Sequence, residues 1–188
     1  MEIIGEKVLY EERWTLLKEK AYRDRDGRLG SWTYVERQGR RRAVVIVALT
    51  ADSDSLVLIE QFRVPLETTV VEFPAGLVDA DEDLETAARR ELMEETGFEG
   101  EILEISPPVS TSAGLTTETV HMVYMRVGEQ PASEPGPEGS ERITVRVAPP
   151  RDFGSLLEEY QRKDLVLDAK VYVYLKERSE ALSQERNS

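Results

Sequence analysis

A short segment near the middle of the chain gathers carboxylates in a pattern that suits metal-ion chemistry. Residues 82–95 are rich in Glu, Leu and Ala, lack Pro and Gly, and precede Gly97, so the sequence predicts a helix there. At about 100° per residue, one stripe of this helix is apolar in its first turns and acidic in its last turns. The stripe consists of Leu84, Ala88, Glu91 and Glu95, with Glu94 beside it.

Acidic residues in this position oppose one another. Glu91 repels Glu95 and Glu94, and the helix dipole disfavours anions at the C-terminal end, each effect costing from a few tenths to about 1 kcal/mol. A bound divalent cation would reverse these costs, and carboxylate oxygens prefer hard ions such as Mg²⁺ or Mn²⁺. Charge alone also allows a solvated acidic face paired with Arg89 and Arg90.

The spacing of the flanking residues favours the metal site. Gly76 is followed after five residues by Glu82, and after seven more by the run RELMEETGF at 90–98. The segment resembles the Nudix box, G-x5-E-x7-R-E-U-x-E-E-x-G-U with U a bulky apolar residue, at every defined position. The resemblance implies a Nudix-type α/β/α sandwich with a mixed sheet.

The same resemblance implies roles for individual residues. Glu91, Glu94 and Glu95 would ligate Mg²⁺ (or Mn²⁺), with Glu94 also counted as catalytic, and the backbone carbonyl of Ala75 would add a ligand. Arg90 would hold the glutamates by ion pairing, with Glu82 as its structural partner. The metal ions would bridge a diphosphate, neutralise its charge and lower the pKa of a bound water.

The elements around this segment alternate between strand and helix patterns. Apolar and alternating runs predict strands at 7–10, 13–22, 31–37, 43–49, 56–62, 70–73, 100–105, 118–127 and 142–147, and Pro74-Ala75-Gly76 should stop the strand before it. Asp26-Gly27 predicts a hairpin turn. Helices are expected near 151–161 and 167–180. This order predicts an α+β fold with an N-terminal antiparallel β subdomain at 1–40 and a polar tail at 181–188 that should fray. The resemblance to the Nudix box implies that the hydrolase domain spans 41–180.

Composition excludes several classes of function. The net charge of −13 disfavours nucleic acid as a partner, and the longest apolar runs are too short for a membrane span. There are no cysteines, and the first residues lack the pattern of a secretory signal, so a cytoplasmic protein is expected. An acidic protein that binds phosphate must use local arginines or a bound cation.

Three segments outside the box indicate a branch of the family. Residues 61–63 (QFR), 72–77 (EFPAGL) and 167–172 (LDAKVY) resemble the ADP-ribose and ADP-sugar pyrophosphatase branch. This resemblance implies hydrolysis of ADP-ribose, or a related nucleoside diphosphate sugar, to AMP and ribose 5-phosphate. Action on UDP-sugars, GDP-sugars or another dinucleotide, and nucleotide sensing without turnover, stay open.

The branch also implies how the nucleotide is bound. Trp14 and Trp32 match tryptophans that stack on adenine, one from each subunit of a homodimer, although tryptophans usually pack in cores or interfaces. Arg37 and Arg63 match contacts to the phosphates or sugar, where a surface ion pair is the plainer explanation. Leu77 matches a backbone contact to the ligand.

Two loops carry the remaining candidates. Ser112 belongs to residues 111–115 (TSAGL), where Ala113 replaces the proline common in this branch; because proline fixes φ, its loss places the sugar preference in question. Glu141 follows a Pro- and Gly-rich loop and matches a glutamate that orders or deprotonates the attacking water, although its sequence context suits an ordinary polar loop residue.

Overall fold

The computed structural model describes residues 1–39, 42–136, 142–162 and 165–185 of the chain. In chain order, the elements are β1 (Glu2–Glu11), β2 (Thr15–Arg23), β3 (Leu29–Arg37), β4 (Ala43–Thr50), β5 (Leu56–Arg63), η1 (Val64–Leu66), β6 (Thr68–Glu72), β7 (Ala75–Leu77), α1 (Leu84–Thr96), β8 (Gly100–Ile105), β9 (Val109–Ser110), β10 (Thr119–Val127), β11 (Ile143–Ala148), η2 (Pro150–Asp152), α2 (Phe153–Arg162), β12 (Val166–Leu167) and α3 (Ala169–Glu185).

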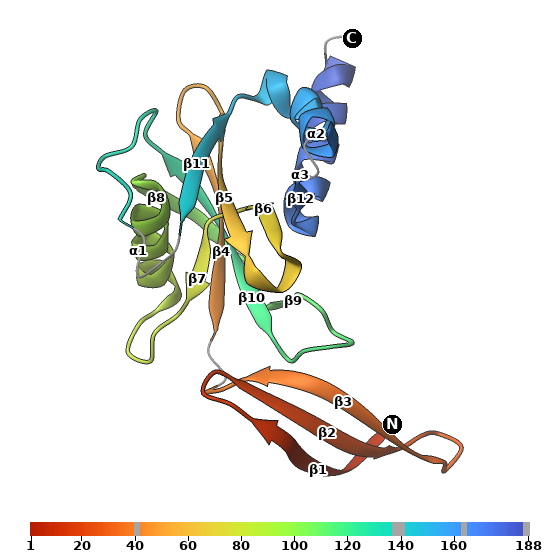
Figure 1. Cartoon of the computed structure of the whole chain (residues 1–188). Helices are drawn as coiled ribbons and strands as arrows, with labels where there is room; N and C mark the ends of the chain where they lie inside the picture. The colour runs from red at the N-terminus through yellow and green to blue at the C-terminus, as the bar shows by residue number, and fades with distance from the viewer. Residues whose placement is uncertain (40–41, 137–141, 163–164, 186–188) are drawn as a thin grey trace.

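The first three strands form a sheet of their own. β1, β2 and β3 pair antiparallel in that order (Figure 1). The predicted hairpin between β2 and β3 is confirmed: Gly27 has a φ of 81°, and the Asp24 carboxylate accepts the N–H groups of Asp26 and Arg28 at 2.9 and 2.8 Å. Every residue of β1 is exposed, so this sheet presents a whole strand to solvent.

The remaining strands form a mixed sheet between two layers of helix. Nine strands belong to it, in the order β12-β6-β5-β4-β10-β8, with β11 on β5, β7 on β4 and β9 on β10. β4 runs parallel to β10, and β6 runs parallel to β12. Figure 1 shows α1 on one side of this sheet and α2 with α3 on the other, which confirms the α/β/α sandwich.

The continuous apolar run of β4 explains why both faces of the sheet are covered. Ala43, Val45 and Val47 belong to the core shared with α2 and α3, whereas Val44 and Ile46 belong to the core shared with α1. A strand whose successive side chains are all apolar must be buried on both faces.

β4 and β5 form the predicted second hairpin, but they pair only next to the turn. Their register contains Ala48 opposite Val57 and Leu49 opposite Leu56. Beyond these pairs β5 joins β6 and β11, whereas β4 joins β7 and β10. The two strands therefore separate toward one end of the sheet.

One predicted stop is confirmed and one predicted boundary is wrong. β6 ends at Glu72, so Pro74-Ala75-Gly76 stops the strand before it as predicted, but the sequence did not predict the short strand β7, which begins at Ala75 and pairs with β4. The last helix does not end near residue 180 but continues to Glu185, because Leu182 packs against the core and Lys176 pairs with Glu180 at 2.7 Å.

The central helix, α1, has a well-defined start and end. Asp83 caps its first turn, because its carboxylate accepts the N–H of Thr86 at 2.7 Å. Gly97 ends it in the left-handed region with φ 73°, donating its N–H to the carbonyl of Met93 at 2.8 Å. Its buried face packs on the sheet through Ala87, Ala88 and Leu92. No helix in the described ranges is both long and apolar enough to cross a membrane.

Candidate active site

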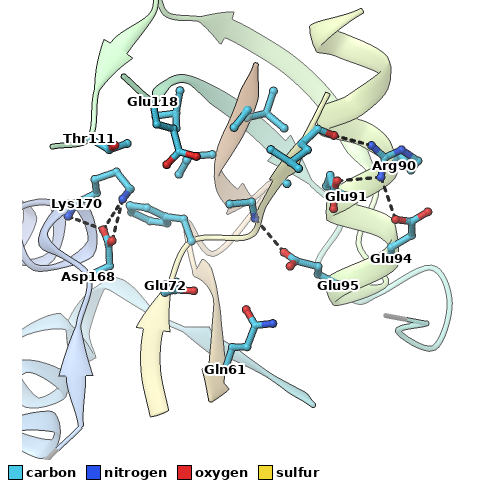
Figure 2. A pocket seen from close by; sticks show the side chains of 18 of the residues that line it. Gln61, Glu72, Arg90, Glu91, Glu94, Glu95, Thr111, Glu118, Asp168 and Lys170 are labelled. Carbon is cyan, nitrogen blue, oxygen red and sulfur yellow. Dashed lines mark hydrogen bonds and ion pairs between the residues drawn. The ribbon is translucent and has the colours of Figure 1, made fainter. Parts of the chain in front are cut away.

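A cleft of about 770 Å³ lies where β4 and β5 separate. Its walls come from β4, β5, β6, β7, α1, the start of β10 and the start of α3, and Figure 2 looks into it. The lining side chains that carry charge are Arg37, Arg63, Glu72, Asp79, Arg90, Glu91, Glu94, Glu95, Glu118, Asp168 and Lys170.

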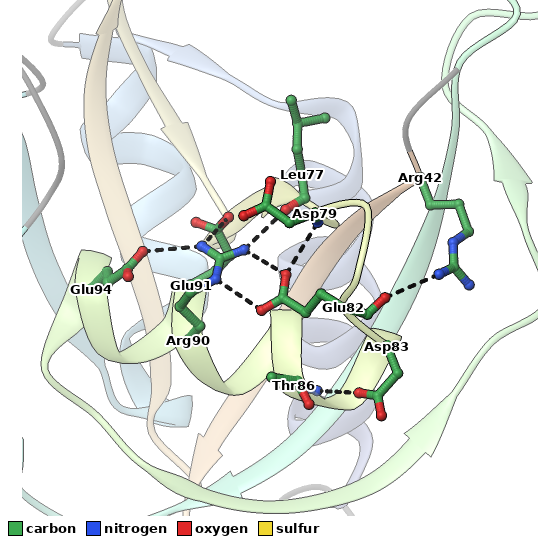
Figure 3. A network of polar contacts seen from close by, with 9 residues as sticks. All are labelled: Arg42, Leu77, Asp79, Glu82, Asp83, Thr86, Arg90, Glu91 and Glu94. Atoms are coloured by element: carbon green, nitrogen blue, oxygen red, sulfur yellow. Dashed lines mark hydrogen bonds and ion pairs between the residues drawn. The ribbon is translucent and has the colours of Figure 1, made fainter. Parts of the chain in front are cut away.

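Arg90 is the centre of the polar network on the α1 wall (Figure 3). Its Nε and Nη2 atoms donate to the two carboxylate oxygens of Glu82, both at 2.9 Å. Its Nη1 atom donates to Glu91 at 2.9 Å and to Glu94 at 3.1 Å, and Nη2 also reaches the carbonyl of Leu77 at 3.1 Å. The planar guanidinium thus fixes three carboxylates and the β7 backbone relative to one another.

Arg90 affects its partners unequally. Its hydrogen bonds lower the pKa of Glu82 below the usual 4.5. The pKa of Glu91 is raised instead, because burial disfavours its charged form more than Arg90 favours it. Glu91 is therefore a partly buried carboxylate whose charge the protein compensates only in part.

Gly76 makes room for this carboxylate. A Cβ atom at position 76 would overlap the carboxyl group of Glu91, so any other residue would force Glu91 to move. Glu95 is 6% exposed and accepts the N–H of Ala75 at 2.9 Å. Both glutamates are thus held against the backbone that leads into β7.

The donor chemistry of this wall fits a hard divalent cation, although its carboxylates do not converge. Within the described ranges, no three His, Cys, Asp or Glu side chains are close enough together to hold a metal ion. Arg90 holds Glu91 and Glu94, and Glu95 is turned to the Ala75 amide. The partly compensated charge of Glu91 favours a cation there, and Glu94, with 31% of its side chain exposed, has room to turn toward it.

The other basic side chains along the cleft each hold a carboxylate that also lines it. Arg37 donates to Glu118 at 2.7 and 3.0 Å, and Arg63 donates to Glu72 at 2.9 Å through Nε. Lys170 pairs with Asp168 at 2.8 Å. Both predicted arginines therefore line the cleft, and they do so within ion pairs.

Sequence reasoning assigned no role to several of these cleft residues. Glu72, Asp168 and Lys170 lie inside the segments that indicated the branch, so a signal for them was present. Glu118 had none, because its partner Arg37 is 81 residues away in the chain.

Trp14, Trp32 and Ser112 are not among the residues that line this cleft. Both tryptophans are more than half exposed, at 57% and 55%. The Trp32 indole N–H donates to the carbonyl of Gly114 at 2.9 Å, which joins the N-terminal sheet to the 112–115 loop. Ser112 closes that loop, because its carbonyl accepts the N–H of Leu115 at 2.9 Å.

The remaining predicted residues either belong to the box segment or lie outside the described residues. Ala75, Leu77, Arg90, Glu91, Glu94 and Glu95 line the cleft together, whereas Glu82 is not among its lining residues and holds Arg90 from behind. Glu141 lies outside the described residues.

Comparison with known proteins agrees with this arrangement. Residues 39–170 match the family described as the NUDIX domain. The chain is 32% identical over 184 residues to the ADP-sugar pyrophosphatase of Mus musculus, covering 92% of this chain and 84% of that protein. It is 30% identical to the GDP-mannose pyrophosphatase of Cronobacter sakazakii, covering 93% of each.

A solved structure described as an ADP compounds hydrolase has the same fold. It superposes with a TM-score of 0.69 at 25% identity, covering 83% of this chain and 82% of the other. With the box residues gathered on one wall of a cleft and the family match spanning most of the sequence, the chain belongs to the Nudix domain family.

Proposed function

We propose that this protein hydrolyses the diphosphate bond of ADP-ribose, or of a related nucleoside diphosphate sugar, to AMP and ribose 5-phosphate with Mg²⁺. Mn²⁺ is the alternative ion. The observation that carries the proposal is the Arg90-centred cluster of glutamates on the wall of a cleft with further basic side chains. The mouse relative, named for ADP-sugars, supports the substrate class.

Some residues of the chain would hold the metal ion, and others keep those residues in place. Glu91, Glu94, Glu95 and the Ala75 carbonyl would hold the cation, which would supply charge neutralisation for the diphosphate and a water of lowered pKa. Arg90 fixes the orientation of Glu91 and Glu94 and is itself held by Glu82 and the Leu77 carbonyl. Leu77 is also the residue expected to contact the ligand through its backbone.

Other residues bind the substrate and move the proton. Arg37 and Arg63 offer planar guanidinium groups to the phosphates or the sugar. We assign the role of general base to Glu141, which accepts the proton of the attacking water. Ser112 holds the loop beside Trp32.

The base is proposed to stack between Trp14 of one protomer and Trp32 of another. The backbone of Trp14 is bonded to Gln38, six residues beyond Trp32, so at about 3.3 Å per residue the backbone positions of the two tryptophans stand about 20 Å apart along one sheet. A sandwiched base needs rings about 7 Å apart, two van der Waals contacts. One chain therefore cannot supply both, which supports a homodimer in which residues 1–40 bind the partner and the base.

A panel of substrates tests the reaction. With Mg²⁺, ADP-ribose should be cleaved faster than UDP-glucose, GDP-mannose or diadenosine diphosphate, with AMP as the released mononucleotide. GDP-sugars are the second candidate, because the Cronobacter relative is matched over 93% of its length. Preference for GDP-mannose would establish GDP-sugars as the substrates instead. If no diphosphate compound is turned over, nucleotide sensing without hydrolysis is the remaining candidate.

A matched pair of variants ties the reaction to the cluster. Glu94→Gln should lower kcat about a hundredfold or more, a loss typical of removing charge stabilisation from a transition state. Glu85→Gln removes the same charge from an exposed position of the same helix and should leave kcat unchanged. Equal activity of the two variants would separate the reaction from this cluster.

A further inference from the structure

Gln61 is a buried polar side chain in the cleft whose oxygen has no partner among the described residues. It is 5% exposed, it lines the cleft, and its Oε1 atom accepts no hydrogen bond from any residue that the structure describes. Buried acceptors in folded proteins are nearly always satisfied, so an orphaned one on a residue that lines a ligand cavity points to a donor supplied by the ligand.

The protein groups beside Gln61 are already engaged. Arg63 follows two residues later on β5 and so points to the same face, but its Nε and Nη2 atoms both donate to Glu72. Glu72 and Glu95 are carboxylates that accept hydrogen bonds themselves, from Arg63 and from the Ala75 amide. Glu72 and Glu95 are therefore acceptors like the Gln61 oxygen, and Arg63, the basic side chain nearby on β5, is already bonded to Glu72.

The chemistry of the substrate narrows the donor. An ionised diphosphate has only acceptors, so it cannot satisfy Oε1. The donors of a nucleoside diphosphate sugar are the hydroxyl groups of its sugars and the amino group of its base.

The arrangement of the cleft selects among these donors. Figure 2 shows Gln61 and Glu72 on one side of the strand that carries the Glu95 contact, and Thr111 and Glu118 on the other. Glu118 is paired with Arg37 of β3, so that second side adjoins the N-terminal sheet where the base is placed. Because the base and the terminal sugar stand at opposite ends of the diphosphate, the terminal sugar falls on the Gln61 side.

We propose that Gln61 is a specificity residue whose carboxamide oxygen accepts a hydrogen bond from a hydroxyl group of the terminal sugar. The inference rests on the proposed function, because it needs a sugar nucleotide in the cleft. Gln61 would thus distinguish sugar diphosphates from diphosphates that carry another group at that end.

Two substrates that share the adenosine half test this. One is ADP-ribose, and the other is the methyl ester of ADP, which keeps the diphosphate diester but has no terminal sugar. Gln61→Met, close in size but without the acceptor, should lower kcat/KM for ADP-ribose about tenfold, the loss expected for one hydrogen bond. The same variant should leave kcat/KM for the methyl ester unchanged. If the methyl ester is not cleaved, its inhibition constant against ADP-ribose hydrolysis should be unchanged instead.

Two further variants complete the experiment. Gln61→Glu keeps an acceptor and should retain the wild-type ratio between the two substrates, even if its charge lowers both rates. Gln130→Met makes the same exchange at an exposed position outside the cleft and should change neither. Thermal unfolding of each variant measures any loss of fold.

The outcomes separate the two proposals. An equal loss of kcat/KM on both substrates in Gln61→Met would assign Gln61 to the fold or to the attacking water and overturn the inference. No loss of kcat/KM on either substrate would overturn it too. If the wild-type protein cleaves neither substrate, the proposed function itself fails, a result visible before any variant is made.

Discussion

At the scale of single residues, the site depends on one arginine and on the space beside one glycine. Arg90 contacts Glu82, Glu91 and Glu94 at once, which a lysine, with its single ammonium group, cannot reproduce in one plane. Gly76 leaves the space that the Glu91 carboxylate occupies. Arg90 determines where the carboxylate charges lie, and Gly76 leaves room for the carboxylate of Glu91.

Gly76→Ala should therefore damage activity far more than stability. The added methyl group meets only the end of a flexible side chain, so the fold can adapt, whereas Glu91 must leave its position. We expect kcat/KM to fall about a hundredfold, as for a misplacement of about 1 Å, and the free energy of unfolding to change by less than about 1 kcal/mol. Steady-state kinetics and urea unfolding measure the two quantities.

Gly154→Ala is the control for this exchange. Its Cβ would enter open space on α2, so activity should stay at the wild-type level. An active Gly76→Ala enzyme would show that the position of Glu91 is not essential.

The sequence predicted residues whose spacing is local and missed those whose contacts are not. Glu91, Glu94 and Glu95 fall within one helix, where periodicity places them together, and the resemblance to the Nudix box added Arg90 and Glu82. The pairing of Arg37 with Glu118 depends on β3 lying beside the start of β10, which the pattern of either segment does not reveal. The unsatisfied oxygen of Gln61 is likewise a property of the packed cleft.

At the scale of elements, the separation of β4 from β5 creates the site, and the turn between them fixes where it begins. Glu129 stabilises this turn from the end of β10: its carboxylate accepts the N–H groups of Asp52 and Ser53 at 2.6 and 3.1 Å and the Ser53 hydroxyl at 2.9 Å. These hydrogen bonds, that of the Asp52 amide first, lower the pKa of Glu129 below the usual 4.5.

Glu129→Gln should consequently destabilise the protein in a pH-dependent way. A carboxylate with a lowered folded pKa adds stability above its unfolded pKa, and this contribution is lost as pH falls through the folded value. The difference in free energy of unfolding from wild type should be full above about pH 5 and shrink below 4.5. Urea unfolding at several pH values measures it.

Glu101→Gln removes the same charge from an exposed position of β8, so it measures the effect of the lost net charge on the free energy of unfolding. A Glu129→Gln difference that does not vary with pH, after this correction, would contradict the assigned role.

Element prediction failed where tertiary contacts outweigh local pattern. The Pro-Ala-Gly run ends β6 as its pattern predicts, but the pattern does not show that the chain then joins β4: the Pro74 carbonyl accepts the N–H of Ile46, and β7 follows. The tail beyond residue 180 is polar, yet Leu182 anchors another turn of α3.

At the scale of the whole molecule, the proposed base sandwich needs a second chain, because the backbone positions of Trp14 and Trp32 stand about 20 Å apart along one sheet. The full exposure of β1 gives that chain a surface to cover. A symmetric dimer would then carry two equivalent sites, each using Trp14 from one protomer and Trp32 from its partner.

Mixing two variants that bind ADP-ribose weakly tests this arrangement. Trp14→Ala and Trp32→Ala should each raise KM for ADP-ribose more than they lower kcat. Unfolded and refolded together, they should regain about a quarter of the wild-type sites, because half of the dimers are mixed and each mixed dimer has one intact sandwich. Titration of the high-affinity sites measures the recovery.

Each variant refolded alone is the control. No recovery on mixing, with dimers confirmed by sedimentation velocity, would place both tryptophans outside a shared site. A monomeric protein would contradict the dimer itself.

An anion enters this cleft by exchange rather than by addition. Each basic side chain that the described ranges place along it already holds a carboxylate of the same cleft, as Arg63 holds Glu72 and Lys170 holds Asp168. A ligand must displace these internal counter-ions, and dissolved salt weakens the pairs being broken as well as those being made. A diphosphate bound there would displace more of these carboxylates at once than a single phosphate could, so the internal ion pairs would favour ligands of higher charge.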